Sequence, residues 1–327
     1  MTVTIRTDFD AATAPFRREL VVHCYRMLGS VHDAEDLAQE TLIRAWKARG
    51  RYDEQRASLR TWLYRIATNA CLTALEGRAR RPLPSGLGPA SDDPYTPLVP
   101  DFEVPWLQPL PDSYLRHDQG DPMSRATERA GVRLALIAAM QLLPPRQRAV
   151  LVLRDVLQFS ATEVAAQLDT STAAVNSALQ RARAALAVAS PRENAMREPD
   201  DRAVRETIER YIRAFESADV DTLVTLLTED AVLEMPPVPL WYGGRVDYGR
   251  FIARIFTMRG TGWRMVQTSA NSQPALAAYC PDDTGVLRLH TLQVLTVTTG
   301  GIAHNVVFQD PHVFAAFELT SVLEPDH

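Results

Sequence analysis

Apolar residues recur every three or four positions through the first quarter of the chain, from residue 12 to residue 82. The pattern breaks at Gly29-Ser30 and again at 50–53. In the stretch 33–46, DAEDLAQETLIRAW, small and apolar side chains form one stripe that ends at Trp46, while acidic and then basic side chains lie outside it. Apolar spacing of this period predicts helices, so 12–82 is expected to form an all-α domain.

A different composition follows over residues 83–123, which are dense in Pro, Gly, Ser and Asp. Such a composition predicts an extended linker. Within it, the segment 104–112, VPWLQPLPD, mixes Trp106 and Leu107 with prolines, and it can dock as a preformed extended strand. Helical periodicity returns over 124–188, which predicts a second all-α domain.

This second domain carries a helix-turn-helix pattern, with helices expected at about 161–168 and about 172–187. Ser160 and Glu163 have the spacing of a capping box, and Ser171 can cap the second helix. Asn and Gln pair with adenine edges and Arg with guanine or phosphate, so the outer face of the second helix predicts DNA binding, against the alternative of an ordinary helical hairpin. The candidate DNA-binding residues on that face are Thr172, Ala173, Asn176, Ser177, Gln180, Arg181 and Arg183.

Residues 200–323 have a third pattern, which predicts an α+β domain. One amphipathic helix is expected from residue 202, and a second over 220–236. The Val-, Leu- and Thr-rich stretch 285–310 has a Gly-Gly pair at 300–301, which predicts two antiparallel strands. The expected fold class is therefore multidomain, with two all-α domains followed by one α+β domain.

Charge is distributed unevenly along the 327 residues. Residues 1–199 hold 25 basic and 23 acidic residues, net +2, whereas 200–327 hold 10 basic and 17 acidic residues, net −7. No apolar run approaches the roughly 20 residues of a membrane span, and no secretory signal is seen, so a cytoplasmic protein without membrane contact is expected. The three cysteines are far apart, and no spacing predicts a metal or a cofactor.

The segment 60–81, RTWLYRIATNACLTALEGRARR, interleaves aromatic residues with arginines. Arginines can contact phosphates, and aromatic rings can stack on unpaired bases, so this helix is a candidate for single-stranded DNA binding. The alternative for Trp62 is a place in the core. The candidate residues are Arg60, Trp62, Tyr64, Arg65, Asn69, Arg78, Arg80 and Arg81.

The stretches 33–46, 60–81 and 144–188 together resemble domains 2 and 4 of the extracytoplasmic-function (ECF) group of sigma factors, in the family's order. The resemblance implies that 33–46 docks on the β′ clamp helices of core RNA polymerase, and that Trp46 locks this helix into its own domain. It also implies that 58–81 grips and melts the −10 element of promoter DNA. The helix from 172 would read the −35 element. The implied polymerase contacts are Asp36, Gln39, Glu40 and Arg44.

One departure concerns the −35 helix. This chain has Asn176 and Ala178 where the family commonly has basic residues, which predicts a less basic −35 contact.

The C-terminal region more loosely resembles SnoaL-like domains, in which a curved sheet and helices form a cone around a pocket. Enzymes on this cone use an acid and a base, but the spacing of Asp230 and Asp310 fixes no such pair, so no enzymatic activity is expected. A regulatory domain is expected instead, which binds a small molecule or contacts the sigma domains. The candidate pocket residues are Trp241, Tyr242, Arg245, His290 and His304.

Two other classes of protein remain as alternatives. One is a one-component helix-turn-helix regulator with a ligand-binding C-terminal domain. The other is an enzyme with a DNA-targeting arm. The first leaves the acidic face of 33–46 unexplained, and the second predicts a complete acid–base pair in the C-terminal pocket. A sigma factor with a fused regulatory domain is therefore the favoured prediction.

Overall fold

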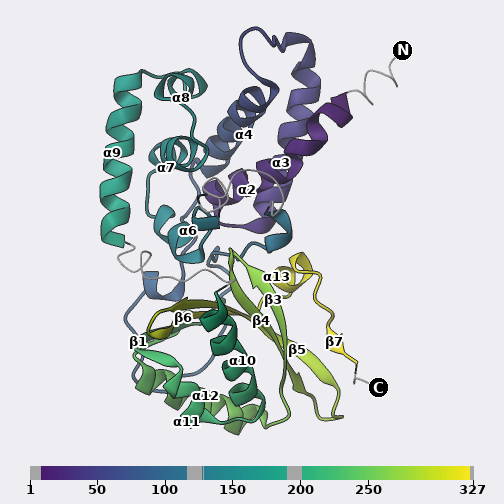
Figure 1. Ribbon diagram of the computed structural model, residues 1–327, viewed down its shortest axis with the longest axis vertical. Helices are drawn as coiled ribbons and strands as arrows, with labels where there is room; N and C mark the ends of the chain where they lie inside the picture. Colours follow the sequence, from purple (N-terminus) through teal and green to yellow (C-terminus); the bar gives the residue numbers. More distant parts are fainter. Residues whose placement is uncertain (1–8, 116–126, 128, 190–200, 325–327) are drawn as a thin grey trace. The chain divides into compact units, whose positions relative to one another are not determined.

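The computed structural model describes residues 9–115, 127, 129–189 and 201–324. The chain divides into two compact units (Figure 1). The first comprises residues 1–81 and 112–191, and the second comprises residues 82–111 and 192–327. The end of the predicted linker, 116–123, and residues 190–200 lie outside the described residues.

The N-terminal half of the first unit is helical, and its helix boundaries follow local sequence signals. Gly29, with φ of 67°, ends one helix in the left-handed conformation that glycine adopts readily. Ser30 then caps the next helix by accepting a hydrogen bond from the Asp33 amide, and Ser58 does the same for Thr61. The helices are α2 (Arg17–Leu28), α3 (Val31–Ala48) and α4 (Leu59–Leu75).

The C-terminal half of the first unit contains the predicted helix-turn-helix. Its helices are α6 (Leu134–Met140), α7 (Pro145–Leu151), α8 (Ala161–Gln167) and α9 (Thr172–Ala189), with a π-helical turn at Val152–Val156. The capping box of Ser160 and Glu163 is present at α8. The Ser171 hydroxyl accepts from the Ala174 amide at 3.2 Å, as expected for the cap of the second helix.

A buried arginine joins the two halves of the first unit. Arg148 of α7 is 3% exposed, and its guanidinium donates to the Met27 carbonyl at the end of α2 and to Gln141 Oε1 at 2.8 Å. Arg26 of α2 in turn donates to the Gly131 carbonyl at 3.1 Å. Burial lowers the pKa of Arg148 to about 10, which still leaves it charged near neutral pH. Hydrogen-bonded partners offset the cost of burying this charge.

The second unit is built on a seven-stranded sheet in the order β2-β1-β6-β5-β4-β3, with β7 beside β5. All pairs are antiparallel except β1 with β6. The strands are β1 (Leu227–Glu234), β2 (Trp241–Gly243), β3 (Arg264–Ala270), β4 (Gln273–Pro281), β5 (Leu287–Thr298), β6 (Gly301–Phe308) and β7 (Val322–Leu323). The helices are α10 (Arg202–Glu216), α11 (Val220–Thr225), α12 (Arg245–Arg259) and α13 (Pro311–Ala316).

The main core of the second unit lies between its helices and the sheet, with α10 and α12 packed against the strands (Figure 1). On α10, Val204, Ile208, Tyr211 and Phe215 form a buried stripe, which agrees with the predicted amphipathic helix. The predicted hairpin is confirmed, since β5 and β6 are antiparallel and join at the Gly-Gly turn. A Cβ on Gly301 would lie 2.5 Å from the Leu226 carbonyl oxygen, so the turn requires glycine.

The helix predicted over 220–236 is wrong beyond its first turns. α11 ends at Thr225, and the chain continues as strand β1 between β2 and β6. Leu227 and Ala231 are four residues apart, which suits a helix face as well as a strand. Pairing of the β1 backbone with two neighbouring strands decides in favour of the strand.

Stability of the first unit is expected to fall in acid because of His23. This residue is fully buried between α2 and α4, and its Nε2 lies 3.0 Å from the Thr68 hydroxyl. Burial, followed by the charges of Arg26 and Arg60, lowers the pKa of His23 to about 3. Between pH 6.5 and pH 3 the unfolded chain therefore binds a proton that the folded unit excludes. The free energy of unfolding should drop by about 1.4 kcal/mol per pH unit over this window.

Urea denaturation of the wild type and of His23→Gln across this pH range measures the effect. The substitution should lower the slope of the free energy of unfolding against pH by the equivalent of about one bound proton. An equal slope in both proteins would contradict the assignment.

Candidate functional site

The predicted polymerase-binding face of α3 is open to solvent. Asp36, Gln39 and Arg44 are exposed, and Glu40 is half-exposed. Arg44 donates to Glu40 Oε1 through two nitrogens, at 3.0 and 2.6 Å. An exposed pair of this kind contributes little to folding, so the face is free to exchange these contacts for those of a partner.

Trp46 packs within its own domain. Its ring meets Phe9 edge-on at 5.4 Å, and the Arg49 guanidinium lies 3.7 Å above it. The side chain is half-buried rather than part of the deep core, which is formed on α3 by Ala34, Ala38 and Ala45.

Four of the arginines expected to contact the −10 DNA make ion pairs with carboxylates. The pairs are Arg60 with Glu19 at 3.4 Å, Arg65 with Asp169 at 3.3 Å, and Arg78 and Arg81 with Asp33 at 3.0 and 2.8 Å. Asn69 and Arg80 are exposed. Carboxylates here occupy positions around the guanidinium groups that DNA phosphates could take. The more exposed pairs, those of Arg65 and Arg78, are of a weak kind.

The two aromatic candidates on α4 differ. Tyr64 is 1% exposed, its hydroxyl donates to Glu19 Oε2 at 3.2 Å, and its ring contacts His23 and Phe159. Its predicted DNA contact is therefore wrong for this structure, because Tyr64 is a core side chain. Trp62 is half-buried and lies against Tyr52, with ring centres 5.0 Å apart.

The outer face of α9 presents every residue expected to read the −35 element. Thr172, Ala173, Asn176, Ser177, Gln180, Arg181 and Arg183 are all exposed. Arg183 makes two bonds to the Asp155 carboxylate, at 2.8 and 2.7 Å, and Arg181 donates to Ser177 Oγ at 2.6 Å. The opposite face is buried at Val175, Leu179 and Ala182. The helix thus has one exposed polar face and one buried apolar face, as a recognition helix needs.

The proline-rich residues 82–111, called the strap here, belong to the second unit. At its C-terminal end, Leu110 donates to Asn271 Oδ1 at 2.8 Å and accepts from the Asn271 amide at 2.9 Å. Near its N-terminal end, the Ser85 amide and hydroxyl bond the Glu234 carboxylate, which also lies 3.0 Å from His304 Nε2. Within the segment 104–112, Leu107 is fully buried.

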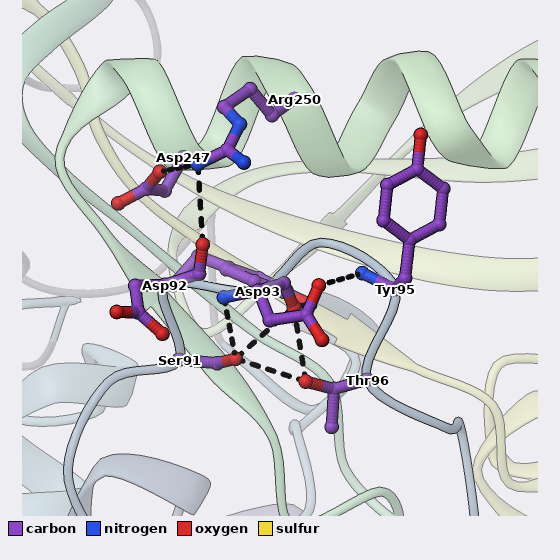
Figure 2. Close-up of polar contacts among 8 residues, drawn as sticks. Ser91, Asp92, Asp93, Tyr95, Thr96, Asp247 and Arg250 are labelled. Atoms are coloured by element: carbon purple, nitrogen blue, oxygen red, sulfur yellow. Dashed lines mark hydrogen bonds and ion pairs between the residues drawn. The ribbon is translucent and has the colours of Figure 1, made fainter.

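The middle of the strap is held through its backbone carbonyls. Arg254 of α12 donates to the carbonyls of Pro94 and Thr96, at 2.6 and 2.8 Å. Figure 2 shows the Arg250 guanidinium between the Asp247 carboxylate and the Asp92 carbonyl. The acceptors are backbone carbonyl groups. This part of the docking therefore depends on the path of the strap's backbone and not on its side chains.

Four of the five candidate pocket residues serve other contacts. Trp241 and Tyr242 donate to the strap carbonyls of Gly88 and Asp93, at 2.9 and 3.1 Å. His304 pairs with Glu234, and the half-exposed Arg245 pairs with Glu229 at 3.5 Å. The strap covers this part of the second unit, and the sequence alone does not show that. Of the five, only His290 lines the cavity described next.

A cavity of about 510 Å³, counting the part open to solvent, lies inside the second unit. Its wall is mainly apolar, and it includes Leu98 of the strap and Trp263. Gln293 and Asn305 form a polar base; the Tyr211 hydroxyl donates to Gln293 Oε1 at 2.9 Å. Asp230 is exposed on β1 and Asp310 caps α13, so neither carboxylate lines the cavity.

The described residues contain no group of three His, Cys, Asp or Glu side chains placed to hold a metal ion. In the same residues, no helix is long and apolar enough to cross a bilayer.

Three family models match the chain. The model of sigma-70 region 2 matches residues 14–81, that of sigma-70 region 4 matches 133–186, and that of a SnoaL-like domain matches 208–305. The two all-α domains and the C-terminal α+β domain that the sequence predicts are thereby confirmed as to class.

Comparison with individual proteins leads to the same family as the family models. The chain is 50% identical over 321 residues to the ECF RNA polymerase sigma factor SigG of Mycobacterium tuberculosis, a match that covers 97% of this chain and 85% of that protein. It is 32% identical to SigJ of the same organism over 68% of this chain and 62% of SigJ. The crystal structure of SigJ has the same fold, with a TM-score of 0.64, 24% identity, and coverage of 95% and 99%.

The chain therefore belongs to the ECF group of RNA polymerase sigma factors, with a C-terminal SnoaL-like domain. Sigma factors bind core RNA polymerase and promoter DNA to initiate transcription, and α2–α4 and α6–α9 correspond to regions 2 and 4.

Loosening of the strap is expected when Arg254 is replaced by Ala. The substitution removes both hydrogen bonds to the Pro94 and Thr96 carbonyls, and bonds from charged donors are among the stronger ones in proteins. Chymotrypsin should then cut at Tyr95 and Phe102 about 10-fold faster, because cleavage requires local release of the backbone.

Cleavage products identified by mass spectrometry measure this rate. Arg210→Ala, which removes an exposed arginine of α10, is the matched control and should cut like the wild type. Equal rates in all three proteins would contradict a role of Arg254 in docking.

Proposed function

We propose that the exposed polar face of α3 docks on the β′ clamp helices of core RNA polymerase. Asp36, Gln39, Glu40 and Arg44 lie on one solvent-facing side of the helix, away from the alanines that pack into the core. The single observation that carries this proposal is that folding leaves these four side chains on the surface with only one weak ion pair among them.

The proposed −10 contact is α4 with the loop before it. Trp62 is half-buried beside Tyr52, and Arg65 of the helix and Arg78 beyond it form ion pairs while remaining about half-exposed. Phosphates would replace the carboxylates, with affinity that falls as salt rises. The proposed contacts are Arg60, Trp62, Arg65, Asn69, Arg78, Arg80 and Arg81.

The proposed −35 reader is α9 in the major groove. Asn176 and Gln180 would meet base edges, while Arg181 and Arg183 would meet bases or phosphates. Thr172, Ala173 and Ser177 at the start of the helix would come closest to the bases, as the N-terminal residues of a recognition helix do.

The SnoaL-like domain is proposed to regulate the sigma regions through the strap, which is the covalent connection between regions 2 and 4. The −10 and −35 elements are about 25 base pairs apart, or about 85 Å at 3.4 Å per pair. A strap bound along the C-terminal domain cannot extend over that span. In addition, Phe159 of region 4 contacts Tyr64 of region 2, so the two regions pack together in this structure.

We further propose that the protein acts in the cytoplasm, where polymerase and promoter DNA are found, and that its C-terminal domain binds rather than catalyses. An uncharged cavity wall supports the second point, since acid–base catalysis by carboxylates would need at least one of them there.

Charge reversal at Asp36 and Glu40 tests the polymerase contact. The double substitution Asp36→Arg, Glu40→Arg should lower affinity for core RNA polymerase at least 10-fold, because two interfacial carboxylates become repulsive. Binding is measured by fluorescence anisotropy of the labelled full chain.

The matched control is Glu206→Arg, Glu209→Arg, which reverses two exposed carboxylates on α10. Circular dichroism confirms that both variants fold. Unchanged affinity of a folded Asp36, Glu40 variant would reject the proposed docking face.

A further inference from the structure

Two side chains of region 4 lie on the first two turns of α4, the helix proposed to contact the −10 strand. Phe159, just before α8, is 5% exposed, and its ring centre lies 5.7 Å from that of Tyr64 and 5.1 Å from the Arg60 guanidinium carbon. Asp169, between α8 and α9, lies 3.3 Å from the Arg65 guanidinium. Region 4 therefore covers the side of α4 that carries Arg60 and Arg65.

The turn of the helix-turn-helix places an anion on Arg65. Asp169 has φ of 48°, in the left-handed region that Asp and Asn enter more readily than most residues. The following amide, of Thr170, donates to the Ala165 carbonyl at 2.9 Å, which fixes the turn. Because the Asp169 side chain is 77% exposed and that of Arg65 49%, the pair is of the weak surface kind, and a DNA phosphate can replace the carboxylate.

The proposed −35 reader stays accessible while regions 2 and 4 are packed together. Every candidate residue on the outer face of α9 is exposed. The carboxylate that pairs with Arg183 comes from Asp155, which belongs to region 4 itself. The two proposed DNA-binding surfaces therefore differ, because region 4 covers part of the −10 surface and leaves its own −35 surface open.

The closed arrangement is also held by bonds away from α4. Arg148 of region 4 donates to the Met27 carbonyl, and Arg26 of region 2 donates to the Gly131 carbonyl at 3.1 Å. Arg148 and Arg26 are 3% and 2% exposed. Separation of the regions breaks these bonds, so a ligand opens the chain only if it binds the covered face more tightly than region 4 does.

We propose that this chain recognises promoter DNA in a fixed order. Region 4 reads the −35 element while Phe159 and Asp169 still cover α4, and the −10 strand binds only after region 4 has left that helix. Asp169 holds the place of a strand phosphate at Arg65. The affinity for the strand is therefore reduced by the fraction of chains that are open. This inference rests on the proposed −10 and −35 contacts of α4 and α9.

The first test uses a fluorescein-labelled short oligothymidylate, whose binding to the full chain is measured by fluorescence anisotropy. Phosphate contacts and stacking tolerate any sequence, so this strand reports on α4 without knowledge of the promoter. Asp169→Asn removes the charge and keeps a side chain suited to the left-handed backbone. It should raise the affinity about threefold, the effect of one exposed ion pair.

Asp155→Asn is the matched control, because it breaks the exposed pair with Arg183 within region 4. It should leave the affinity for oligothymidylate unchanged. Equal affinities of the Asp169→Asn and Asp155→Asn proteins would overturn the competition between Asp169 and the strand.

Arg65→Gln separates the inference from the proposed function on which it rests. Alone, it should weaken oligothymidylate binding, and unchanged binding would reject Arg65 as a −10 contact. Asp169 acts through Arg65, so Asp169→Asn should have no effect in the Arg65→Gln background. If Arg65→Gln weakens binding but the gain from Asp169→Asn persists in that background, α4 still binds DNA and the covering role of Asp169 is overturned.

Spin labels on the two regions test the order. Ile43→Cys on α3 and Val188→Cys on α9 supply exposed attachment sites, and Cys280→Ser removes the native thiol that is not buried. The distance between the labels, measured by double electron–electron resonance, should stay at its free-chain value with a short mixed-sequence duplex. It should lengthen with oligothymidylate.

Each other outcome contradicts one part of the proposal. A complex with oligothymidylate that keeps the free-chain distance would show that the strand binds α4 without displacing region 4. Failure of the closed chain to bind the duplex, or a longer distance with the duplex alone, would overturn the order.

Discussion

Docking of the strap on the SnoaL-like domain is the constraint on which the proposed regulation depends. Residues 82–111 connect sigma region 2 to region 4, yet they fold as part of the C-terminal unit. Thirty extended residues could reach about 100 Å at about 3.3 Å each. Docked, their backbone donors and acceptors are instead bound along α12, Asn271 and Glu234. Much of the binding is to main-chain atoms, so it depends on the extended path that the prolines favour.

The arginines proposed to contact DNA have ion-pair partners in the free chain and yet stay accessible to solvent. Arg65, Arg78 and Arg183 each have a carboxylate partner, but all three remain about half-exposed or more. Exposed pairs contribute little to stability, so exchanging a carboxylate for a phosphate costs little. Arg148 differs from these arginines. Its carbonyl partners lie inside the first unit, so a DNA phosphate cannot replace them.

Local signals in the sequence were sufficient for the helix-turn-helix, the caps at Ser160 and Ser171, and the β5–β6 hairpin. Each of these depends on residues close together in the chain. Features that depend on distant contacts were not predictable. Tyr64 has the spacing and neighbours of a DNA-stacking residue, but Glu19 and Phe159 bury it. Similarly, strap contacts, invisible in the sequence, occupy Trp241 and Tyr242.

Hydrogen exchange of the strap in the free chain and in its complex with core RNA polymerase and promoter DNA tests the central claim most directly. The account predicts strong protection of residues 82–111 in the free chain and its loss in the promoter complex, because the strap must leave the C-terminal domain before regions 2 and 4 can separate. Equal protection in both states would contradict it.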